Sequence, residues 1–235
     1  MLAIEKLNQF YGESHTLWDL DLDVPRGQCT CVMGRNGVGK TTLMKAIMGE
    51  VAVKSGALVF QGGEGGIELT RKAVEARSRL GIGFVPQGRQ IFPMLTVEEN
   101  LRTGLAARGD GLKKIPARIF ELFPVLEEMK HRRGGDLSGG QQQQLAIGRA
   151  LVIEPKLLIL DEPGEGIQPN IVAQIGQVIR QLIEEDGLTV LLVEQKLPFA
   201  RKYADRFVIM DRGRPVAKGE IGELSQELIK QHLTV

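Results

Sequence analysis

The sequence predicts an α/β domain with a mainly parallel sheet, an antiparallel β part near the N-terminus and an inserted helical subdomain. Two observations carry most of this prediction. Apolar, β-branched runs recur with helical stretches between them, in "GQCTCVMG", "GIGFVPQ", "KLLILDEP", "GLTVLLVEQ" and "ADRFVIMD". Residues 96–135 break this rhythm, because they are rich in Leu, Glu, Arg and Lys. Strands that alternate with helices are typical of a parallel sheet.

The antiparallel part is expected at the start of the chain. The segments "LAIEKLNQFY" and "TLWDLDLDVP" alternate apolar with polar residues, as half-exposed antiparallel strands do. The segment "FQGGEGGIELT" carries a glycine-rich turn between two short strand candidates.

The helical subdomain is expected at about residues 96–135, between two parts of the core at 1–95 and 136–235, all within one domain. "PARIFELFPVLEEM" has helical spacing, and Pro116 is placed for a helix start. A further helix is predicted to begin near Ser138. The tail "GELSQELIKQHLTV" predicts a closing amphipathic helix.

Composition favours an ordinary soluble globule. The 235 residues are 43% hydrophobic and 25% charged, with a net charge of +1, which gives no bulk electrostatic case for nucleic acid as a partner. We find no signal peptide, and no apolar run approaches the roughly 20 residues that span a bilayer, so membrane-spanning parts would belong to other chains. The two cysteines, Cys29 and Cys31, are expected to be buried thiols in a reducing cytosol.

The stretch "GRNGVGKTT" fits a phosphate-binding loop between a strand and a helix. Its glycines let backbone N–H groups point at phosphate oxygens, and the helix start adds its dipole. A lysine can reach the β- and γ-phosphates, and a threonine hydroxyl can ligate Mg²⁺. The expected cradle comprises Gly34, Arg35, Asn36, Gly37, Val38, Gly39, Lys40, Thr41 and Thr42.

The buried strand in "LLILDE" ends in two acids, Asp161 and Glu162. Open α/β sheets bind ligands at the carboxyl ends of their strands. The first acid suits a contact with Mg²⁺, and the second suits orienting and deprotonating an attacking water.

The stretch "LSGGQQQQ" predicts a second phosphate-binding helix start. Ser138 is a good N-cap, Gly139 and Gly140 expose the first N–H groups, and Gln141 lies at the same edge. The remaining glutamines are expected to continue the helix. One chain then has two cradles and one nucleotide site, and we expect the second cradle to serve the nucleotide of another chain.

These motifs, in this order, resemble the ATP-binding-cassette (ABC) family over essentially the whole chain. The resemblance implies a P-loop NTPase core and two cassettes that close head to tail over two ATP molecules with Mg²⁺. It also implies that Tyr11 stacks on adenine and that Gln87 contacts Mg²⁺ and the attacking water. "IFPMLTVEENL" would form part of the surface that receives a short helix of the membrane subunit, although its apolar residues could equally be core.

Three residues depart from the usual pattern of this family. Gln195 stands where a histidine is usual, so we expect it to position the γ-phosphate while Glu162 acts as the base. Gln168 replaces an aspartate that often couples the two sites, and Gly164 replaces a threonine or serine. The segments "VEQ", "EGIQP" and "QQQQLAIGRAL" look like importer ATPases for branched-chain amino acids and, more closely, for urea. The segments "IFPMLTVEENL" and "MKHRRGGDLSGGQQQQLAIGRAL" resemble the urea-importer ATPases in particular.

The resemblance implies an energy-coupling ATPase at the cytoplasmic face of the membrane, peripheral to it. Its partners would be a second cassette, identical or paralogous, integral membrane permease subunits and, indirectly, a periplasmic or extracellular solute-binding protein. The preferred cargo is urea, and a branched-chain amino acid is the alternative. One rival interpretation is a soluble cassette ATPase acting on ribosomes or DNA, which the chain length and charge disfavour. The others are a phosphotransferase that uses the same loop, which would leave "LSGGQ" without a role, and a non-hydrolysing regulatory cassette.

Overall fold

A computed structural model describes residues 1–63, 65–108 and 110–233. Its first sheet has the order β2-β1-β4-β5 with antiparallel pairing throughout. The strands are β1 (Leu2–Tyr11), β2 (Ser14–Val24), β4 (Val53–Phe60) and β5 (Ile67–Glu68). The predicted glycine-rich turn lies between β4 and β5, and its Glu64 is outside the described residues.

The second sheet has the order β10-β9-β3-β8-β7-β6 and is parallel except for the antiparallel edge strand β10. Its strands are β3 (Cys29–Met33), β6 (Ile82–Val85), β7 (Leu157–Asp161), β8 (Thr189–Val193), β9 (Arg206–Asp211) and β10 (Arg214–Glu220). Every residue of β3, β7 and β8 is buried, as expected of strands covered on both faces. The sequence analysis did not predict β10, whose residues are exposed or half-buried.

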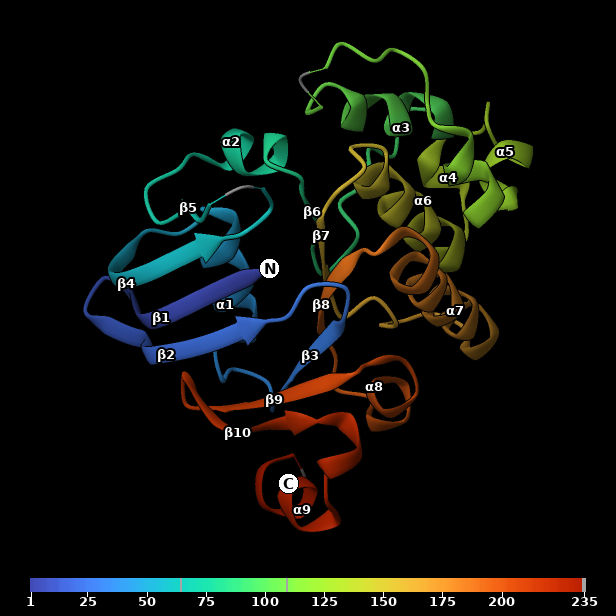
Figure 1. Cartoon of the computed structure of the whole chain (residues 1–235). Coiled ribbons are helices and arrows are strands. Elements are labelled where there is room, and N and C mark those ends of the chain that lie inside the picture. Colours follow the sequence, from blue (N-terminus) through green and yellow to red (C-terminus); the bar gives the residue numbers. More distant parts are fainter. Residues whose placement is uncertain (64, 109, 234–235) are drawn as a thin grey trace.

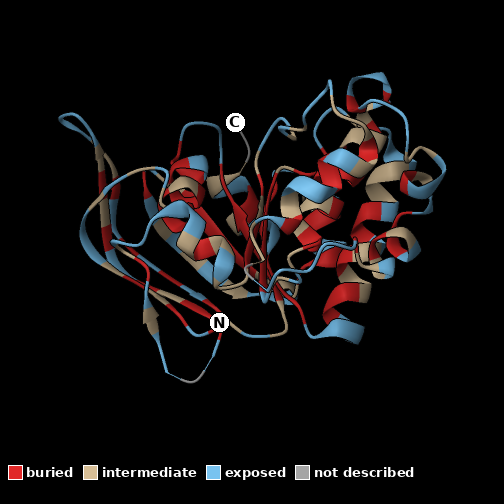
Figure 2. Cartoon of the chain, turned by 90° about the horizontal axis from the view of Figure 1, so that it is seen from above, coloured by how far each residue is buried: buried red, intermediate tan, exposed pale blue. Residues whose placement is uncertain are grey.

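Helices cover both faces of the parallel sheet (Figure 1). Helix α1 (Lys40–Met48) lies between this sheet and the antiparallel one, in a core that includes Leu43, Ile47 and Ile159. The opposite face of the sheet packs against α6 (Gly139–Leu151), α7 (Pro169–Asp186) and α8 (Leu197–Tyr203). Figure 2 shows the buried residues gathered along the strands and on the inward sides of the helices. The predicted α/β fold class is therefore confirmed.

The remaining helices are short. They are α2 (Val74–Arg79), α3 (Val97–Leu105), α4 (Ala117–Leu122), α5 (Pro124–Glu128) and α9 (Gln226–His232), with 3-10 turns at Gly134–Asp136 and Ile221–Glu223. Helices α3 to α6 form the group at the upper right of Figure 1. No helix in the described part of the chain is both long and apolar enough to cross a membrane.

Two expected helices are shorter than their patterns suggested. The single helix predicted from Pro116 is two helices, α4 and α5, because Pro124 has no N–H and begins a new helix after Phe123. The closing helix α9 ends at His232, and Thr234 and Val235, which the pattern had included, lie outside the described residues. Cys29 and Cys31 are buried free thiols, as expected, and burial raises the pKa of both.

A buried arginine joins the antiparallel part to the end of α1. Arg77 is 2% exposed, and its Nη1 donates to the carbonyl oxygens of Ala46 (2.8 Å) and Ile47 (2.6 Å) in the last turn of α1. Its Nε donates to Lys72 O (3.0 Å) and its Nη2 to Leu69 O (2.7 Å). Burial lowers the pKa of Arg77. The guanidinium therefore adds donors at the end of α1, where intrahelical hydrogen bonds run out and Ala46 O also accepts from Gly49 N (3.1 Å).

Candidate functional site

The loop between β3 and α1 has a backbone that only glycine accommodates well. Gly34, Gly37 and Gly39 have φ angles of 152°, 79° and 105°. A Cβ atom on Gly34 would lie 2.5 Å from Met210 O, and one on Gly39 would lie 3.0 Å from Leu17 Cδ2. Gly39 is the N-cap of α1 and brings no side chain, so the first N–H groups of the helix face the space above the loop.

Lys40 lies across this loop. It is 5% exposed, and its Nζ donates to Gly34 O (2.8 Å) and Arg35 O (2.9 Å). Burial lowers the pKa of Lys40, while the nearby charges of Glu162 and Asp161 oppose that change. The loop thus holds a desolvated ammonium group beside a helix N-terminus, which is a strong arrangement for an anion.

The loop borders a cavity of about 650 Å³. Of the residues proposed from the sequence, the cavity brings together Asn36, Gly37, Gly39, Lys40, Thr41, Thr42, Gln87, Glu162 and Gln195. Gly34, Arg35 and Val38 belong to the same loop but do not line the cavity. Tyr11, at the end of β1, is 48% exposed and does not line it either, although Thr16 of the neighbouring strand does.

Asp161 ends the central strand β7 and is 2% exposed. Burial raises its pKa to about 6, and the neighbouring charge of Glu162 adds to the rise. Its two carboxylate oxygens are buried and form no hydrogen bond of good geometry within the described residues, and the neighbouring Thr41 hydroxyl only partly opposes the rise in pKa. A buried carboxylate without good hydrogen bonds costs free energy. Binding a cation would offset that cost, so Asp161 is suited to a metal site.

Glu162 follows in a left-handed backbone conformation, with a φ of 50°. The strained geometry turns its carboxylate toward two amide side chains. Gln87 Nε2 donates to Oε2 (3.2 Å), and Gln195 Nε2 donates to Oε1 and also to Asn36 Oδ1 (2.8 Å). The carboxylate therefore lies between the strand ends and the glycine loop, with both oxygens accepting from neutral donors.

Three further side chains of the cavity were missed by the sequence analysis. Glu165 Oε2 accepts from Gln87 Nε2 (3.0 Å), and Lys196 Nζ donates to Gly164 O (2.7 Å). Glu194 is 3% exposed, and burial raises its pKa. Its position next to Gln195, at the end of an apolar strand, was a usable signal, whereas Glu165 and Lys196 lie in loops whose course the sequence does not indicate.

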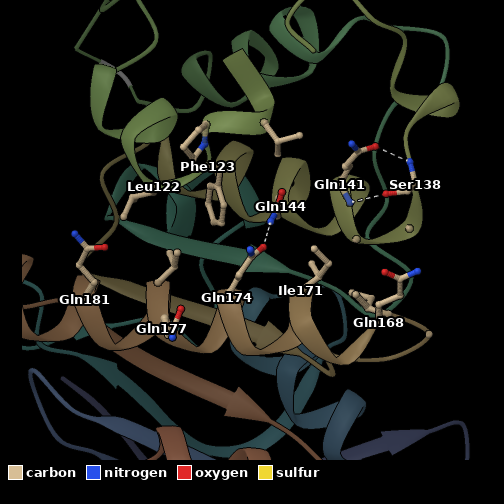
Figure 3. Close-up of a pocket in the computed structure, with 17 residues that line it drawn as sticks. Leu122, Phe123, Ser138, Gln141, Gln144, Gln168, Ile171, Gln174, Gln177 and Gln181 are labelled. Carbon is tan, nitrogen blue, oxygen red and sulfur yellow. Dashed lines mark hydrogen bonds between the residues drawn. The ribbon is translucent and has the colours of Figure 1, made fainter. Parts of the chain in front are cut away.

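The second predicted cradle lies in a different cavity, of about 780 Å³ (Figure 3). Ser138 caps α6 reciprocally, because Gln141 N donates to Ser138 Oγ (3.4 Å) and Ser138 N donates to Gln141 Oε1 (2.9 Å). Gly139 and Gly140 line the same cavity, with Gln168 and several glutamines of α7. Among the described residues, Gly166 alone lines both cavities. The two anion-type helix starts of one chain therefore do not share one pocket.

Gly164 has room for a side chain, which leads to a stability prediction. Its φ lies outside the left-handed region, and an added Cβ would be in ordinary contact with Val172 Cγ1 (3.4 Å) and 3.6 Å from Glu194 Oε2. That oxygen is buried and has no hydrogen-bond partner in the described part of the chain. Gly164→Ser should therefore raise the unfolding free energy by about 1 kcal/mol, through a new hydrogen bond and a stiffer unfolded chain.

The measurement is the thermal midpoint of the nucleotide-free protein, which should rise by about 2–4 °C. Gly164→Ala is the control, because it stiffens the backbone equally but adds no hydroxyl. If the serine variant is no more stable than the alanine variant, the hydroxyl does not reach Glu194 Oε2.

The chain is similar in sequence to known proteins. Residues 17–165 match a family model described as "ABC transporter". The "High-affinity branched-chain amino acid transport ATP-binding protein BraG" of Pseudomonas aeruginosa is 42% identical over 217 residues, which are 92% of this chain and 91% of that protein. The "Probable branched-chain amino acid transport ATP-binding protein LivF" of Archaeoglobus fulgidus is 38% identical over 227 residues, covering 95% and 94%.

The fold is also found among solved structures. A nucleotide-free ATP-binding cassette from an ABC transporter superposes with a TM-score of 0.83 at 28% identity, covering 98% of this chain and 94% of that one. A dimeric bacterial ABC transporter cassette has a TM-score of 0.84 at 24% identity, a likeness of fold alone.

Proposed function

The chain belongs to the ABC transporter family, and from this membership we propose that it is the ATP-binding and ATP-hydrolysing subunit of a multi-chain importer. The observation that carries the proposal is that two helix starts suited to anions line two separate cavities of one chain. A cassette of this kind would complete each nucleotide site only with a second chain, identical or paralogous. Permease subunits would span the membrane, with this chain peripheral on the cytoplasmic face.

In this proposal the glycine loop of residues 34–39 holds the phosphates of ATP. Its left-handed glycines aim N–H groups inward, and the N-terminus of α1 adds a partial positive charge. Lys40 would exchange its contacts with Gly34 O and Arg35 O for the β- and γ-phosphate oxygens. Tyr11 is exposed at the end of β1 and would offer its ring to adenine.

The residues also fit the Mg²⁺ that accompanies ATP. The donor set is oxygen-rich, with the Thr41 hydroxyl, the Gln87 amide and the buried oxygens of Asp161. No cluster of three or more His, Cys, Asp or Glu side chains suited to a metal occurs in the described residues, which agrees with an ion held mainly by phosphates and water. When bound, Mg²⁺ would neutralise charge on the phosphate oxygens.

Glu162 is the proposed general base for the water that attacks the γ-phosphate. Its two hydrogen-bonded amides, Gln87 and Gln195, fix the carboxylate without protonating it, because an amide has no proton to give at neutral pH. Gln195 would then position the γ-phosphate, and Gln87 would position the water. ATP closes the pair of chains in this scheme, and hydrolysis with product release reopens it.

The cargo is proposed from the relatives. The proteins from Pseudomonas aeruginosa and Archaeoglobus fulgidus are both named for branched-chain amino acids, and neither is named for urea. We therefore place branched-chain amino acids first, which reverses the preference drawn from the sequence. Urea stays as a second candidate on the likeness of short segments of the sequence, chiefly 91–101 and 129–151. Uptake of labelled leucine and labelled urea by the reconstituted complex would separate the two.

A charged side chain at Ser138 tests whether two chains complete each nucleotide site together. Ser138→Arg should leave ATP binding by the single chain within about twofold, because Ser138 does not line the cavity of the glycine loop. It should abolish ATP-dependent dimerisation, since the arginine removes the N-cap and fills the edge that faces the second chain. The measurements are ATP binding with a fluorescent analogue and mass by light scattering.

The matched control is Ser225→Arg, which replaces another N-cap serine, at the start of α9 and away from both cavities. That variant should dimerise with ATP like the parent. ATP-dependent dimerisation of the Ser138→Arg protein would refute the shared site.

A further inference from the structure

The segment that follows Gln87 is strained. Gly88, Arg89 and Gln90 have consecutive positive φ angles of 80°, 68° and 46°. Left-handed backbone is uncommon for residues with long side chains, and it persists only where surrounding contacts over-determine it. Only Gly88 of the three adopts it without steric cost.

Helix α6 supplies one set of these contacts. Arg149 Nη2 donates to Gln90 O (2.7 Å) and to Arg89 O (3.5 Å), and the Arg149 guanidinium lies 5.2 Å from the centre of the Phe92 ring. These hydrogen bonds hold the backbone of the strained segment in place. Burial lowers the pKa of Arg149. The segment is therefore held by a helix whose first residues form the second cradle.

The Arg89 side chain makes the other connection, in two directions. Its Nη1 donates to Gln142 Oε1 (3.3 Å) in the first turns of α6, and its Nη2 donates to Glu165 O (3.3 Å) in the loop after Glu162. Its nitrogens would lie 3.3 Å from a Cβ on Gly139, so the absence of a side chain there leaves room for the guanidinium. One side chain thus touches the edge of both cavities.

The contacts of Arg89 are also of a kind that breaks readily. Both acceptors are neutral, and in the part of the chain that the structure describes Arg89 forms no ion pair. Hydrogen bonds of a guanidinium to neutral acceptors are weaker than its bonds to a carboxylate. Both bonds of Arg89 are also long, at 3.3 Å, whereas the bonds that Arg77 donates to buried carbonyls measure 2.6–3.0 Å, so the geometry favours a link that changes during the cycle.

We propose that Arg89 is a positioning residue that ties the start of α6 to the loop carrying Glu162 and Glu165 within one chain. A shift of α6 when the second cradle is loaded would move Arg89, and through Glu165 it would reset the two carboxylates that accept from Gln87. Arg89 contacts neither ATP nor water in this scheme. The inference rests on the proposed ATPase function.

Arg89→Gly tests this link, because glycine removes the side chain and also relieves the strain at a φ of 68°. The variant should keep or raise the thermal midpoint of the parent. Its ATP turnover number should fall about tenfold, which corresponds to about 1.4 kcal/mol, while its KM for ATP stays within about twofold. The turnover number of Arg89→Lys should lie between those of the parent and Arg89→Gly, since an ammonium group cannot reach both acceptors as the planar guanidinium does.

Gln90→Gly is the matched control. It relieves the neighbouring strain and adds the same backbone freedom but keeps the Arg89 side chain, so its turnover should stay within about twofold of the parent. The proposal would be overturned if Arg89→Gly turned over ATP at the parent rate. It would also be overturned if Arg89→Gly had a lowered thermal midpoint or if Gln90→Gly lost as much turnover, because either result would give Arg89 or its loop a merely structural role. A parent protein that hydrolyses no ATP would instead count against the proposed function.

Discussion

Replacing Glu162 with glutamine should lower the ATP turnover number by about 10²–10⁴-fold, the range that a positioned general base contributes. ATP binding should persist, because the glycine loop, Lys40 and Thr41 are untouched. The amide has nearly the shape of the carboxylate, so the closed pair of chains should form and then fail to reopen by hydrolysis. A stable ATP-bound dimer is therefore the second expected result.

The local geometry allows this substitution. In the parent, Gln87 and Gln195 donate to the two oxygens of Glu162, and a glutamine at 162 keeps one acceptor for them. The donor that loses its partner has another acceptor nearby, since Gln87 Nε2 also reaches Glu165 Oε2 (3.0 Å) and Gln195 Nε2 reaches Asn36 Oδ1 (2.8 Å). No buried donor is left alone, so the effect should fall on chemistry and not on folding.

The measurements are phosphate release at saturating ATP and particle mass by light scattering with ATP and Mg²⁺. Glu165→Gln is the matched control, because it neutralises the other carboxylate that accepts from Gln87 without removing the proposed base, and its turnover should fall by no more than a few fold. If the Glu162→Gln protein releases phosphate at the parent rate, Glu162 is not the base and the role must pass to another group.

The parts of the site that the sequence predicted are those defined by local rules. Three positive-φ glycines ahead of a helix, a carboxylate pair at the end of an apolar strand and a serine N-cap each depend on a few consecutive residues, and the structure has all three. The alternation of apolar runs with helical stretches likewise predicted the parallel sheet, because both faces of β7 and β8 are covered.

The parts that the sequence did not predict depend on contacts between distant segments. Thr16 joins the cavity because β2 packs beside the glycine loop, with Trp18 N donating to Gly213 O and Gly213 N donating to Val38 O. Arg89 and Glu165 meet across 76 positions, and nothing in their own neighbours indicates it. The exposed strand β10 was missed because its local pattern is weak, whereas the break between α4 and α5 had a usable local signal in Pro124.

Arg77 is the strongest case of a residue whose role only the fold reveals, and its removal should be the most damaging change outside the site. Arg77→Leu should lower the free energy of unfolding by about 3–5 kcal/mol, because four hydrogen bonds from a charged donor are lost, each worth about 1.5–3 kcal/mol, and the buried leucine offsets part of that loss. Leucine fills much of the space but donates nothing, so the carbonyls of Leu69, Ala46 and Ile47 would be buried without that partner.

The stabilising effect of Arg77 does not come from an ion pair, because none involves Arg77 in the described ranges 1–63, 65–108 and 110–233. The need is for five donors in a planar fork that reaches the end of α1 and the segment before α2 together. Arg77→Lys keeps the charge but offers one nitrogen, so it should recover only part of the lost stability.

Urea denaturation of the nucleotide-free protein measures this effect, and Arg79→Leu is the matched control. Arg79 lies two residues further along α2 and is exposed, so its replacement should change stability by no more than about 0.5 kcal/mol. Equal losses for the leucine variants at 77 and 79 would mean that the four carbonyl contacts of Arg77 contribute nothing specific. Gly49 faces the same guanidinium, and a Cβ atom there would lie only 2.8 Å from Arg77 Cζ. Gly49→Ala should therefore lower the stability of the parent protein, and it should lower the stability of the Arg77→Leu protein by less. Two independent sites would not show this coupling.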